Sequence, residues 1–335
     1  MPPTPASEMT ARTVMILPAP KPLPLRRDFS LVCMCGPAVG FSPDRAGMVW
    51  AVAGCTGRAS RGSMRSRGFE GNLRCDAEIS ASGRIPGPGY ARLVLTTRLN
   101  LPSDGRVLLV VAARNEATAL LCGLNPGVEP PAEWEIFPVA DDVDLVLSGV
   151  GKANAAGATA LVLDPGVHGA VLNVGIGGTL ERDAPAEQLG VVVGASESVF
   201  ADEGVAGPGG FRSLAEFGFP PVPAMGERDA GDGVAGDPVL LRALAGLGVI
   251  DQTGVVATVS SCSGTDAGAV GVAARTGAIV EAMEGAAVGL TAMRLGTPFA
   301  EVRVVSNTTG DRDRQVWDLP GAMAGLERIG AILRG

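Results

Sequence analysis

Two acidic residues and a carboxamide stand where strands and helices are expected to meet. Glu281 and Glu284 flank Met283 at the start of an apolar helical segment, and 23 residues after Glu284 an apolar strand ends in Ser306 and Asn307. Open α/β sheets bind their ligands beyond the carboxyl ends of the strands. We therefore expect a carboxylate, a thioether and a carboxamide to line one ligand site.

The residue types suggest what such a site could bind. Glu284 has small and apolar neighbours, and a buried carboxylate there needs hydrogen-bond donors, which a ribose diol provides. Met283 offers a soft apolar surface to the sugar. Asn307 has both an N–H donor and a C=O acceptor, so it can bind a ligand that presents an acceptor beside a donor. Alternatively, Glu284 is a helix-surface charge, Met283 fills the core and Asn307 caps a turn.

Carboxylates are the expected acid–base groups of this chain. Glu116 follows the first regular strand, either as an ordinary first-turn helix residue or as a carboxylate directed at the same site. His168 is the chain's single histidine and stands in a P-G-V-H-G turn, which predicts a surface residue. Mechanisms that need a catalytic histidine are therefore disfavoured, and acid–base chemistry falls to carboxylates such as Glu116.

Neither the glycine clusters nor the cysteines indicate a cofactor or a metal. The clusters at 149–151 and 175–178, the second of which includes Gly177, lack the spacing of a dinucleotide fingerprint or a P-loop. Each is a tight turn, or together they bring backbone N–H groups close to a ligand. The early cysteines form no paired C-x-x-C motif, which argues against zinc; they are Cys33, Cys35, Cys55 and Cys75.

From residue 106 onward, apolar runs alternate with helical segments. The predicted strands cover 106–113, 144–151, 169–178, 190–197, 254–261, 278–281 and 299–306. The predicted helices cover 115–124, 152–163, 238–247, 266–276, 283–295 and 320–333, and 204–236 is expected to be loop. This alternation predicts a three-layer α/β/α domain whose central sheet is largely parallel or mixed, with helices on both faces.

The first part of the chain differs in composition and charge. Residues 1–105 are dominated by Pro, Gly, Ser and Arg without a persistent period, which predicts a low-order basic extension, or an upstream error in the assigned start, before a catalytic domain at 106–335. Residues 1–100 carry 13 Arg and Lys against 6 Asp and Glu, whereas 101–335 carry 14 against 29. The acidic balance of the second part argues against a nucleic-acid partner.

The sequence also predicts a cytoplasmic protein without a membrane partner. No apolar run is long enough to span a bilayer. Prolines interrupt any signal-peptide core near the N-terminus; they are Pro18, Pro20, Pro22 and Pro24.

The order of these motifs resembles the nucleoside phosphorylase/nucleosidase superfamily from about Val107 to Gly335. The matching motifs are Glu116 after the first strand, S-G-V-G-K (148–152), N-V-G-I-G-G (173–178), S-S-C-S-G-T (260–265), M-E-G-A-A (283–287) and V-S-N (305–307). The 23-residue step from Glu284 to Asn307 equals the step between the ribose-binding Glu and the base-binding acid of the methylthioadenosine nucleosidases in this superfamily. Asn307, the G-D-R-D-R sequence after it and Trp317 resemble the futalosine hydrolases within this superfamily.

The resemblance implies hydrolysis of a purine–ribose N-glycosidic bond through an oxocarbenium-like state, without a cofactor or metal. For futalosine hydrolases it implies release of hypoxanthine from futalosine on an alternative menaquinone pathway. Glu116 would activate water, Glu284 would bind the ribose, and Asn307, oriented by Ser306, would hold the base. The superfamily also implies a homo-oligomer.

The resemblance implies further contacts. Ser261 and Cys262 match the segment that lines the purine, and Phe200 or Phe211 is expected to stack on it. Arg212, on a loop, is expected to pair with the carboxylate of the substrate's 5′ extension.

Alternative functions remain at this point. They are a phosphorylase acting on inosine, a nucleosidase acting on methylthioadenosine or S-adenosylhomocysteine, and a non-catalytic nucleoside-binding protein. No anion clamp is visible around Arg114 and Lys152, which favours water over phosphate as the nucleophile. Asn307 stands where the related adenine nucleosidases have an acid. Its amide can donate to O6 of a 6-oxopurine and accept from the protonated N7, which disfavours adenine nucleosides.

Overall fold

In the computed structural model, the described residues are 95–102, 105–183, 185–226 and 228–335. Most of the predicted extension therefore lies outside the described residues. Helix α1 (Leu95–Arg98) precedes the expected domain boundary at residue 106, and Leu95 and Leu99 are buried in the main core cluster.

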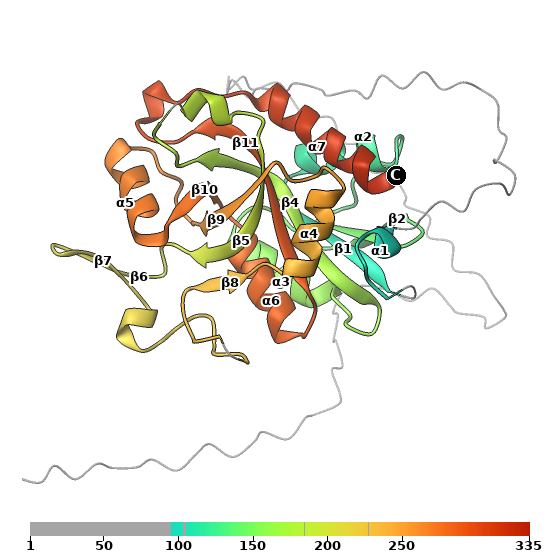
Figure 1. The fold of residues 1–335 in the computed structure, drawn as a ribbon, viewed down its shortest axis with the longest axis horizontal. Coiled ribbons are helices and arrows are strands. Elements are labelled where there is room, and N and C mark those ends of the chain that lie inside the picture. The colour runs from blue at the N-terminus through green and yellow to red at the C-terminus, as the bar shows by residue number, and fades with distance from the viewer. Residues whose placement is uncertain (1–94, 103–104, 184, 227) are drawn as a thin grey trace, which may run out of the picture. The chain divides into compact units, whose positions relative to one another are not determined.

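The strands form a mixed sheet. Among the described residues, nine strands pair in the order β10-β9-β5-β11-β4-β1-β3-β2, with β8 beside β5. Their bounds are β1 (Arg106–Val111), β2 (Ile136–Ala140), β3 (Val143–Leu147), β4 (His168–Thr179), β5 (Val192–Phe200), β8 (Gly233–Ala235), β9 (Gln252–Thr258), β10 (Ala278–Ala282) and β11 (Phe299–Thr308). A separate hairpin, β6 (Gly204–Gly207) and β7 (Gly210–Ser213), extends away from this sheet (Figure 1).

Parallel pairing brings several strand ends to one edge. β1 runs parallel to β3 and β4, and β4 runs parallel to β11. β10 pairs in parallel with β9 but antiparallel with β4, so β4, β11, β5, β9 and β10 form a closed ring of paired strands. The carboxyl ends of β1, β4, β10 and β11 thereby come close together, which is where ligands of such sheets bind.

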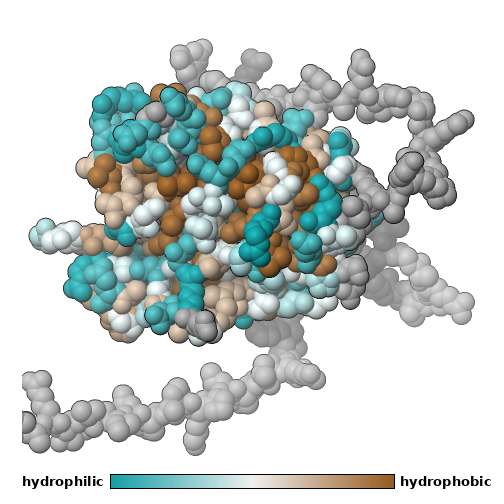
Figure 2. Space-filling model, viewed as in Figure 1, coloured by the Kyte–Doolittle hydropathy of each residue, from teal (hydrophilic) through white to brown (hydrophobic). Residues whose placement is uncertain are grey.

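Helices cover both faces of the sheet. The remaining bounds are α2 (Arg114–Leu124), α3 (Lys152–Val162), α4 (Pro238–Gly246), α5 (Asp266–Thr276), α6 (Gly285–Arg294) and α7 (Leu319–Arg334), with short 3-10 turns at Pro185–Gln188, Ala215–Phe217 and Arg312–Arg314. α2 packs against α7, and α3 packs against α6 (Figure 1). Figure 2 shows apolar patches around α4 on the viewed face, between hydrophilic areas.

Alternating residues of the central strands explain the two helix layers. In β1, Val107 and Leu109 belong to the core cluster that includes α2 and α7, whereas Leu108 and Val110 belong to the cluster that includes α3 and α6. All four side chains are fully buried. Successive residues of a strand point to opposite faces, so a strand buried on both faces is apolar at every position.

The structure corrects the sequence prediction in several places. The 204–236 segment, expected to be loop, contains β6, β7 and β8, and β2 was also missed. His168 is buried rather than on the surface, because it begins β4 and its Nε2 lies 3.2 Å from Asp144 Oδ2. α6 begins at Gly285 rather than at 283, so Glu284 lies between β10 and the helix.

Candidate active site

A cavity of about 270 Å³ lies at the carboxyl ends of β1, β4, β10 and β11. Its lining includes six of the residues expected from the sequence to form a site: Glu116, Gly177, Cys262, Met283, Glu284 and Asn307. The fold therefore brings together residues that lie up to 191 positions apart in the chain.

Glu116 lies in the first turn of α2, directly after β1. Its Oε2 accepts the N–H of Ala113 (3.0 Å) and its Oε1 accepts the N–H of Ile176 (2.9 Å), and the residue is 5% exposed. Burial raises the pKa of Glu116, against the lowering effect of the backbone donors and of Arg303. A raised pKa makes the carboxylate a stronger base near neutral pH.

Arg303 is a buried cation behind this carboxylate. Its Nε donates to Glu301 Oε1 (2.7 Å), Nη2 donates to Asn173 Oδ1, and Nη1 lies 3.3 Å from Glu284 Oε2. Although burial acts to lower it, the carboxylates of Glu301, Glu284 and Glu116 raise the pKa of Arg303. The guanidinium is thus a permanent positive charge that fixes the position of Glu284.

Sequence reasoning missed Arg303, although a signal was present. It is the basic residue in the otherwise apolar run V-R-V-V, and only 1% of it is exposed. Gly175 makes room for it: a Cβ at that position would lie 2.5 Å from Arg303 Nη1 and 3.1 Å from Glu116 Oε1. A buried charge requires such partners, because an unpaired one is strongly destabilising.

Glu284 faces the same cavity from the turn between β10 and α6. Its Oε1 accepts the N–H of Gly151 (3.0 Å) at the start of α3, and the residue is 4% exposed. Each carboxylate oxygen has two lone pairs, so Glu284 keeps acceptor capacity for a ligand's hydroxyl groups. Met283, beside it in the lining, packs against the small core cluster next to α5.

Asn307, near the end of β11, is held by its chain neighbours. The hydroxyl of Ser306 donates to Asn307 Oδ1 (2.8 Å), and Asn307 Nδ2 donates to the carbonyl oxygen of Thr308 (2.9 Å). Ser306 is buried behind the cavity and does not line it. One lone pair and one N–H of the amide remain for a ligand.

A second buried carboxylate, Glu281, lines the cavity from β10. Its two oxygens accept the backbone N–H (2.8 Å) and the hydroxyl (2.6 Å) of Ser263. Burial raises the pKa of Glu281, and the two hydrogen bonds from Ser263 oppose this. The sequence pattern placed Glu281 near the site but assigned it no role.

Four expected contacts lie outside the lining. Ser261 is exposed beyond it, and Phe200 is buried in the core with Lys152 Nζ 5.6 Å from its ring centroid. Phe211 stacks with Arg275 instead. Arg212 lies on the exposed β6–β7 hairpin, where its guanidinium pairs with a nearby glutamate, so in this structure it does not reach the cavity.

The basic residues that follow β1 and β3 already have hydrogen-bond or ion-pair partners. Arg114 donates to the carbonyl oxygens of Pro130 (3.1 Å) and Pro131 (3.0 Å). Lys152 Nζ lies 2.6 Å from Asp202 and 3.2 Å from Glu203. Neither side chain lines the cavity, so neither offers a free charge to an anion there.

The rim of the cavity combines apolar surface with one cation. Val150 and Trp317 line it and are 52% and 47% exposed. The Arg312 guanidinium lies 5.2 Å from the Trp317 ring and donates to Gln315 Oε1 (2.9 Å). Among the described lining residues, Arg312 is the only Arg or Lys.

Ion pairs anchor the segment that carries this cation. Arg314 pairs with Asp311 (2.6 Å) and with Asp266 at the start of α5, and Arg182 also pairs with Asp266. The backbone N–H of Arg312 donates to a carbonyl oxygen in the turn before α5. These contacts anchor residues 311–314 to the start of α5.

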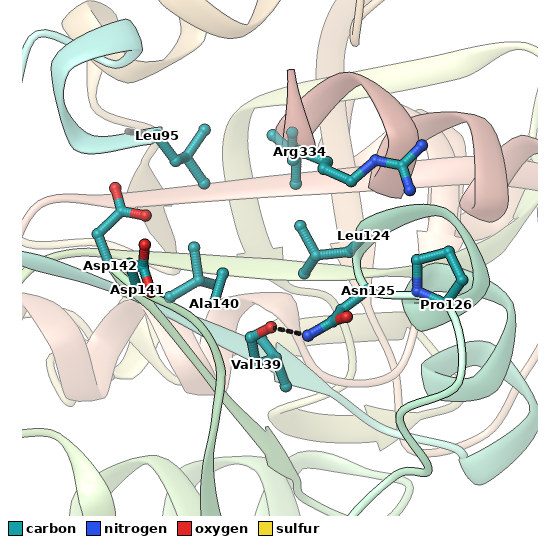
Figure 3. A pocket seen from close by; sticks show the side chains of 11 residues that line it. Leu95, Leu124, Asn125, Pro126, Val139, Ala140, Asp141, Asp142 and Arg334 are labelled. Carbon is teal, nitrogen blue, oxygen red and sulfur yellow. Dashed lines mark hydrogen bonds between the residues drawn. The ribbon is translucent and has the colours of Figure 1, made fainter. Parts of the chain in front are cut away.

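A second cavity lies at the opposite, amino edge of the sheet (Figure 3). It measures about 430 Å³ and is bounded by the ends of α2 and α7, the start of α1 and the β2–β3 turn. Asn125 Nδ2 donates to the carbonyl oxygen of Val139 (2.7 Å), and Asp142 accepts the backbone N–H of Thr96 (2.7 Å). In the described part of the chain, no cluster of three or more His, Cys, Asp or Glu residues could hold a metal ion, and no helix is long and apolar enough to cross a bilayer.

Comparison with known proteins identifies relatives. The model of the phosphorylase superfamily matches residues 111–327. A futalosine hydrolase from Acidothermus cellulolyticus is 33% identical over 231 residues, covering 68% of this chain and 89% of that protein. A futalosine hydrolase from Thermus thermophilus is 36% identical over 182 residues, covering 54% of this chain and 76% of that protein.

Solved structures share the fold. A 5′-methylthioadenosine/S-adenosylhomocysteine nucleosidase from Neisseria meningitidis matches with a TM-score of 0.54 at 22% identity, covering 68% of this chain and 98% of that one. A futalosine hydrolase mutant from Helicobacter pylori matches with a TM-score of 0.52 at 20% identity, with the same two coverages. The predicted α/β class with its mixed sheet is confirmed.

Proposed function

The chain belongs to the phosphorylase superfamily, and we propose that it hydrolyses the N-glycosidic bond of futalosine to hypoxanthine and dehypoxanthine futalosine. The similar proteins named futalosine hydrolase support the reaction and the substrate. The observation that carries the proposal is one cavity in which Glu116 and Glu284 face the same space as a carboxamide, Asn307.

Water is the proposed nucleophile. As the C1′–N9 bond lengthens, positive charge develops on the ribose, and water attacks C1′. Glu116 takes the proton of this water, which its raised pKa favours. Phosphate is disfavoured as the nucleophile because the guanidinium of Arg114 and the ammonium of Lys152 are already paired outside the cavity.

Glu284 is proposed to bind the ribose hydroxyls and to stabilise the developing cation. Its carboxylate is fixed by Gly151 and by Arg303, so it need not reorganise as charge develops. Arg303 acts here as a positioning residue, because its guanidinium bonds protein groups on every side.

Asn307 is proposed to hold the leaving base. The amide donates to O6 of hypoxanthine and accepts from the protonated N7. The N–H groups of Asn307 donate hydrogen bonds but are not acidic. The proton that N7 gains, which neutralises the leaving base, therefore comes from solvent. An adenine base would place its 6-amino group against the amide N–H, which disfavours adenine nucleosides.

The rim is proposed to bind the 5′ extension of futalosine. Its aryl group fits the apolar surface of Val150 and Trp317, and its carboxylate fits the guanidinium of Arg312. We assign this role to Arg312 rather than to the expected Arg212, because Arg212 is paired on the exposed hairpin.

Three further assignments belong to this proposal. They are a place in menaquinone biosynthesis, a cytoplasmic location and a homo-oligomeric state. Exposed apolar side chains, including Val205, Phe217 and Phe219, support the last of these, and light scattering on the purified protein would test it.

The direct test is release of free base by the purified protein from futalosine, inosine and methylthioadenosine, with and without phosphate. We expect phosphate-independent release of hypoxanthine from futalosine, and much slower release from the other two nucleosides. Phosphate-dependent release from inosine would instead make the protein a phosphorylase, and preferential release of adenine would make it a methylthioadenosine nucleosidase.

A further inference from the structure

Glu281 is a buried carboxylate for which the proposed mechanism has no use. It lines the cavity, is 4% exposed, and forms no ion pair with any described residue. Its two oxygens each accept one hydrogen bond, both from Ser263. Each oxygen therefore keeps a free lone pair, and a buried carboxylate is stabilised by every further donor it receives.

Strand register places Glu281 opposite Asn307. Gly178 of β4 is the partner of Glu281 on β10 and of Asn307 on β11. Adjacent strands lie about 4.8 Å apart, so the two backbones are roughly 10 Å apart, and residues in register point to the same face. The acidic side chain of Glu281 and the amide side chain of Asn307 thus flank Gly178.

Gly178 keeps the space between them open. A Cβ at this position would lie 2.9 Å from Asn307 Nδ2 and 2.9 Å from Thr309 Cγ2. Any larger residue would therefore occupy the surface over which a flat ring could lie. On the Glu281 side, Gln315 fixes the geometry by donating to the carbonyl oxygen of Ser263 (3.0 Å).

Purine chemistry matches this pair of groups. A 6-oxopurine carries an N–H donor at N1, next to the O6 acceptor, whereas the N1 of adenine is an acceptor. An ionised carboxylate can only accept hydrogen bonds. With Asn307 at O6 and N7, a carboxylate across the ring is complementary to N1–H and repels the N1 lone pair of adenine.

We propose that Glu281 is a specificity-determining residue that accepts the N1–H of a 6-oxopurine base, with Ser263 positioning its carboxylate. This inference rests on the proposed function, since it names the group that reads the base in the same cavity. Guanine shares the N1–H, so the selected class is the 6-oxopurines rather than hypoxanthine alone.

The test compares binding of free hypoxanthine and free adenine by calorimetry, for the wild type, Glu281→Gln and the control Asp142→Asn at the amino-edge cavity. A hydrogen bond to a charged group contributes about 1.5–3 kcal/mol, so Glu281→Gln should weaken hypoxanthine binding by about 10- to 100-fold. Adenine binding should not weaken, because the new amide can donate to its N1. Asp142→Asn, which is far from the carboxyl-edge lining, should leave both dissociation constants within about threefold of wild type.

Equal weakening of both bases by Glu281→Gln, or no change in either, would overturn the inference. If Glu281→Gln fails to fold, wild-type binding of 1-methylhypoxanthine decides the matter, since this base lacks the N1–H. We expect it to bind at least 10-fold more weakly than hypoxanthine, and equal binding would contradict the proposal. These measurements use free bases, so their outcome is separate from whether the wild type cleaves futalosine.

Discussion

The cavities at the two edges of the sheet differ in what their acidic groups face. The amino-edge cavity is larger, at about 430 Å³ against 270 Å³, yet its carboxylates, Asp141 and Asp142, are exposed or half-buried. At the carboxyl edge, Glu116, Glu281 and Glu284 are each at most 5% exposed. Burying three carboxylates is costly unless donors and ligands compensate, so burial rather than volume marks the functional edge.

The largest effect should follow from removing the proposed base. We expect Glu116→Gln to lower kcat by about 10²- to 10⁴-fold, because the amide cannot accept the proton of water. The matched change at the other edge, Asp142→Asn, should leave kcat within about twofold. Steady-state kinetics on futalosine measures kcat for both variants. Similar losses of kcat would contradict the assignment of the active site to the carboxyl edge.

A smaller effect is expected from changing the amide that holds the base. Asn307→Asp should lower kcat/KM for futalosine by about 10- to 100-fold and shift the preference toward adenine nucleosides, since an acid can protonate N7 and accept from a 6-amino group. The ratio of kcat/KM values for futalosine and methylthioadenosine gives the readout. An unchanged ratio would mean that Asn307 does not contact the base.

The cation of each cavity provides a third comparison. Arg312→Ala should raise KM for futalosine by about 3- to 30-fold, because the substrate carboxylate loses its partner at an exposed rim. Residual turnover of inosine, which lacks that carboxylate, should not change. Arg334→Ala, at the amino-edge cavity, should alter neither, and an equal effect on both nucleosides in Arg312→Ala would point to a structural role for that arginine.

The smallest effect concerns stability and its dependence on pH. Because the pKa of Glu116 is raised in the folded state, the folded protein binds its proton more tightly than the unfolded chain does. Stability from this group is present below the unfolded pKa of about 4.3 and is lost as pH rises through the folded pKa. Between those two pKa values, the free energy of unfolding falls by about 1.4 kcal/mol for each pH unit.

Glu116→Gln removes this dependence. The Tm of the variant relative to wild type should therefore increase between pH 4 and pH 8, and scanning calorimetry at both pH values measures it. A Tm difference that decreases over this range would show that Glu116 is stabilised in its charged form.

The sequence predicted those elements that depend on local patterns, namely apolar runs for strands and capping residues for helices. The apolar runs located β1, β4 and β11 to within two residues, and the spacing from Glu284 to Asn307 located two sides of the cavity. Helix α5 was predicted with the bounds Asp266–Thr276 that the structure has, since Thr265 provides an N-cap and Gly277 a left-handed C-cap.

What could not be predicted depends on contacts between distant strands. The hydrogen bonds of Glu281 with Ser263 depend on the parallel pairing of β10 with β9, after which Ser263 lies. The register of Glu281 and Asn307 about Gly178 depends on the pairing of β4 with both β10 and β11. The sequence did not show where Arg212 lies, because its segment has no hydrophobic period. Nothing in that segment reveals that residues 204–213 form the separate β6–β7 hairpin.

A crystal structure of the protein soaked with hypoxanthine would test the central claim most directly. We expect the base at the carboxyl edge, over Gly178, with Asn307 at O6 and N7 and Glu281 at N1. Hypoxanthine bound in the amino-edge cavity beside Asp142, with the carboxyl-edge cavity empty, would contradict this claim.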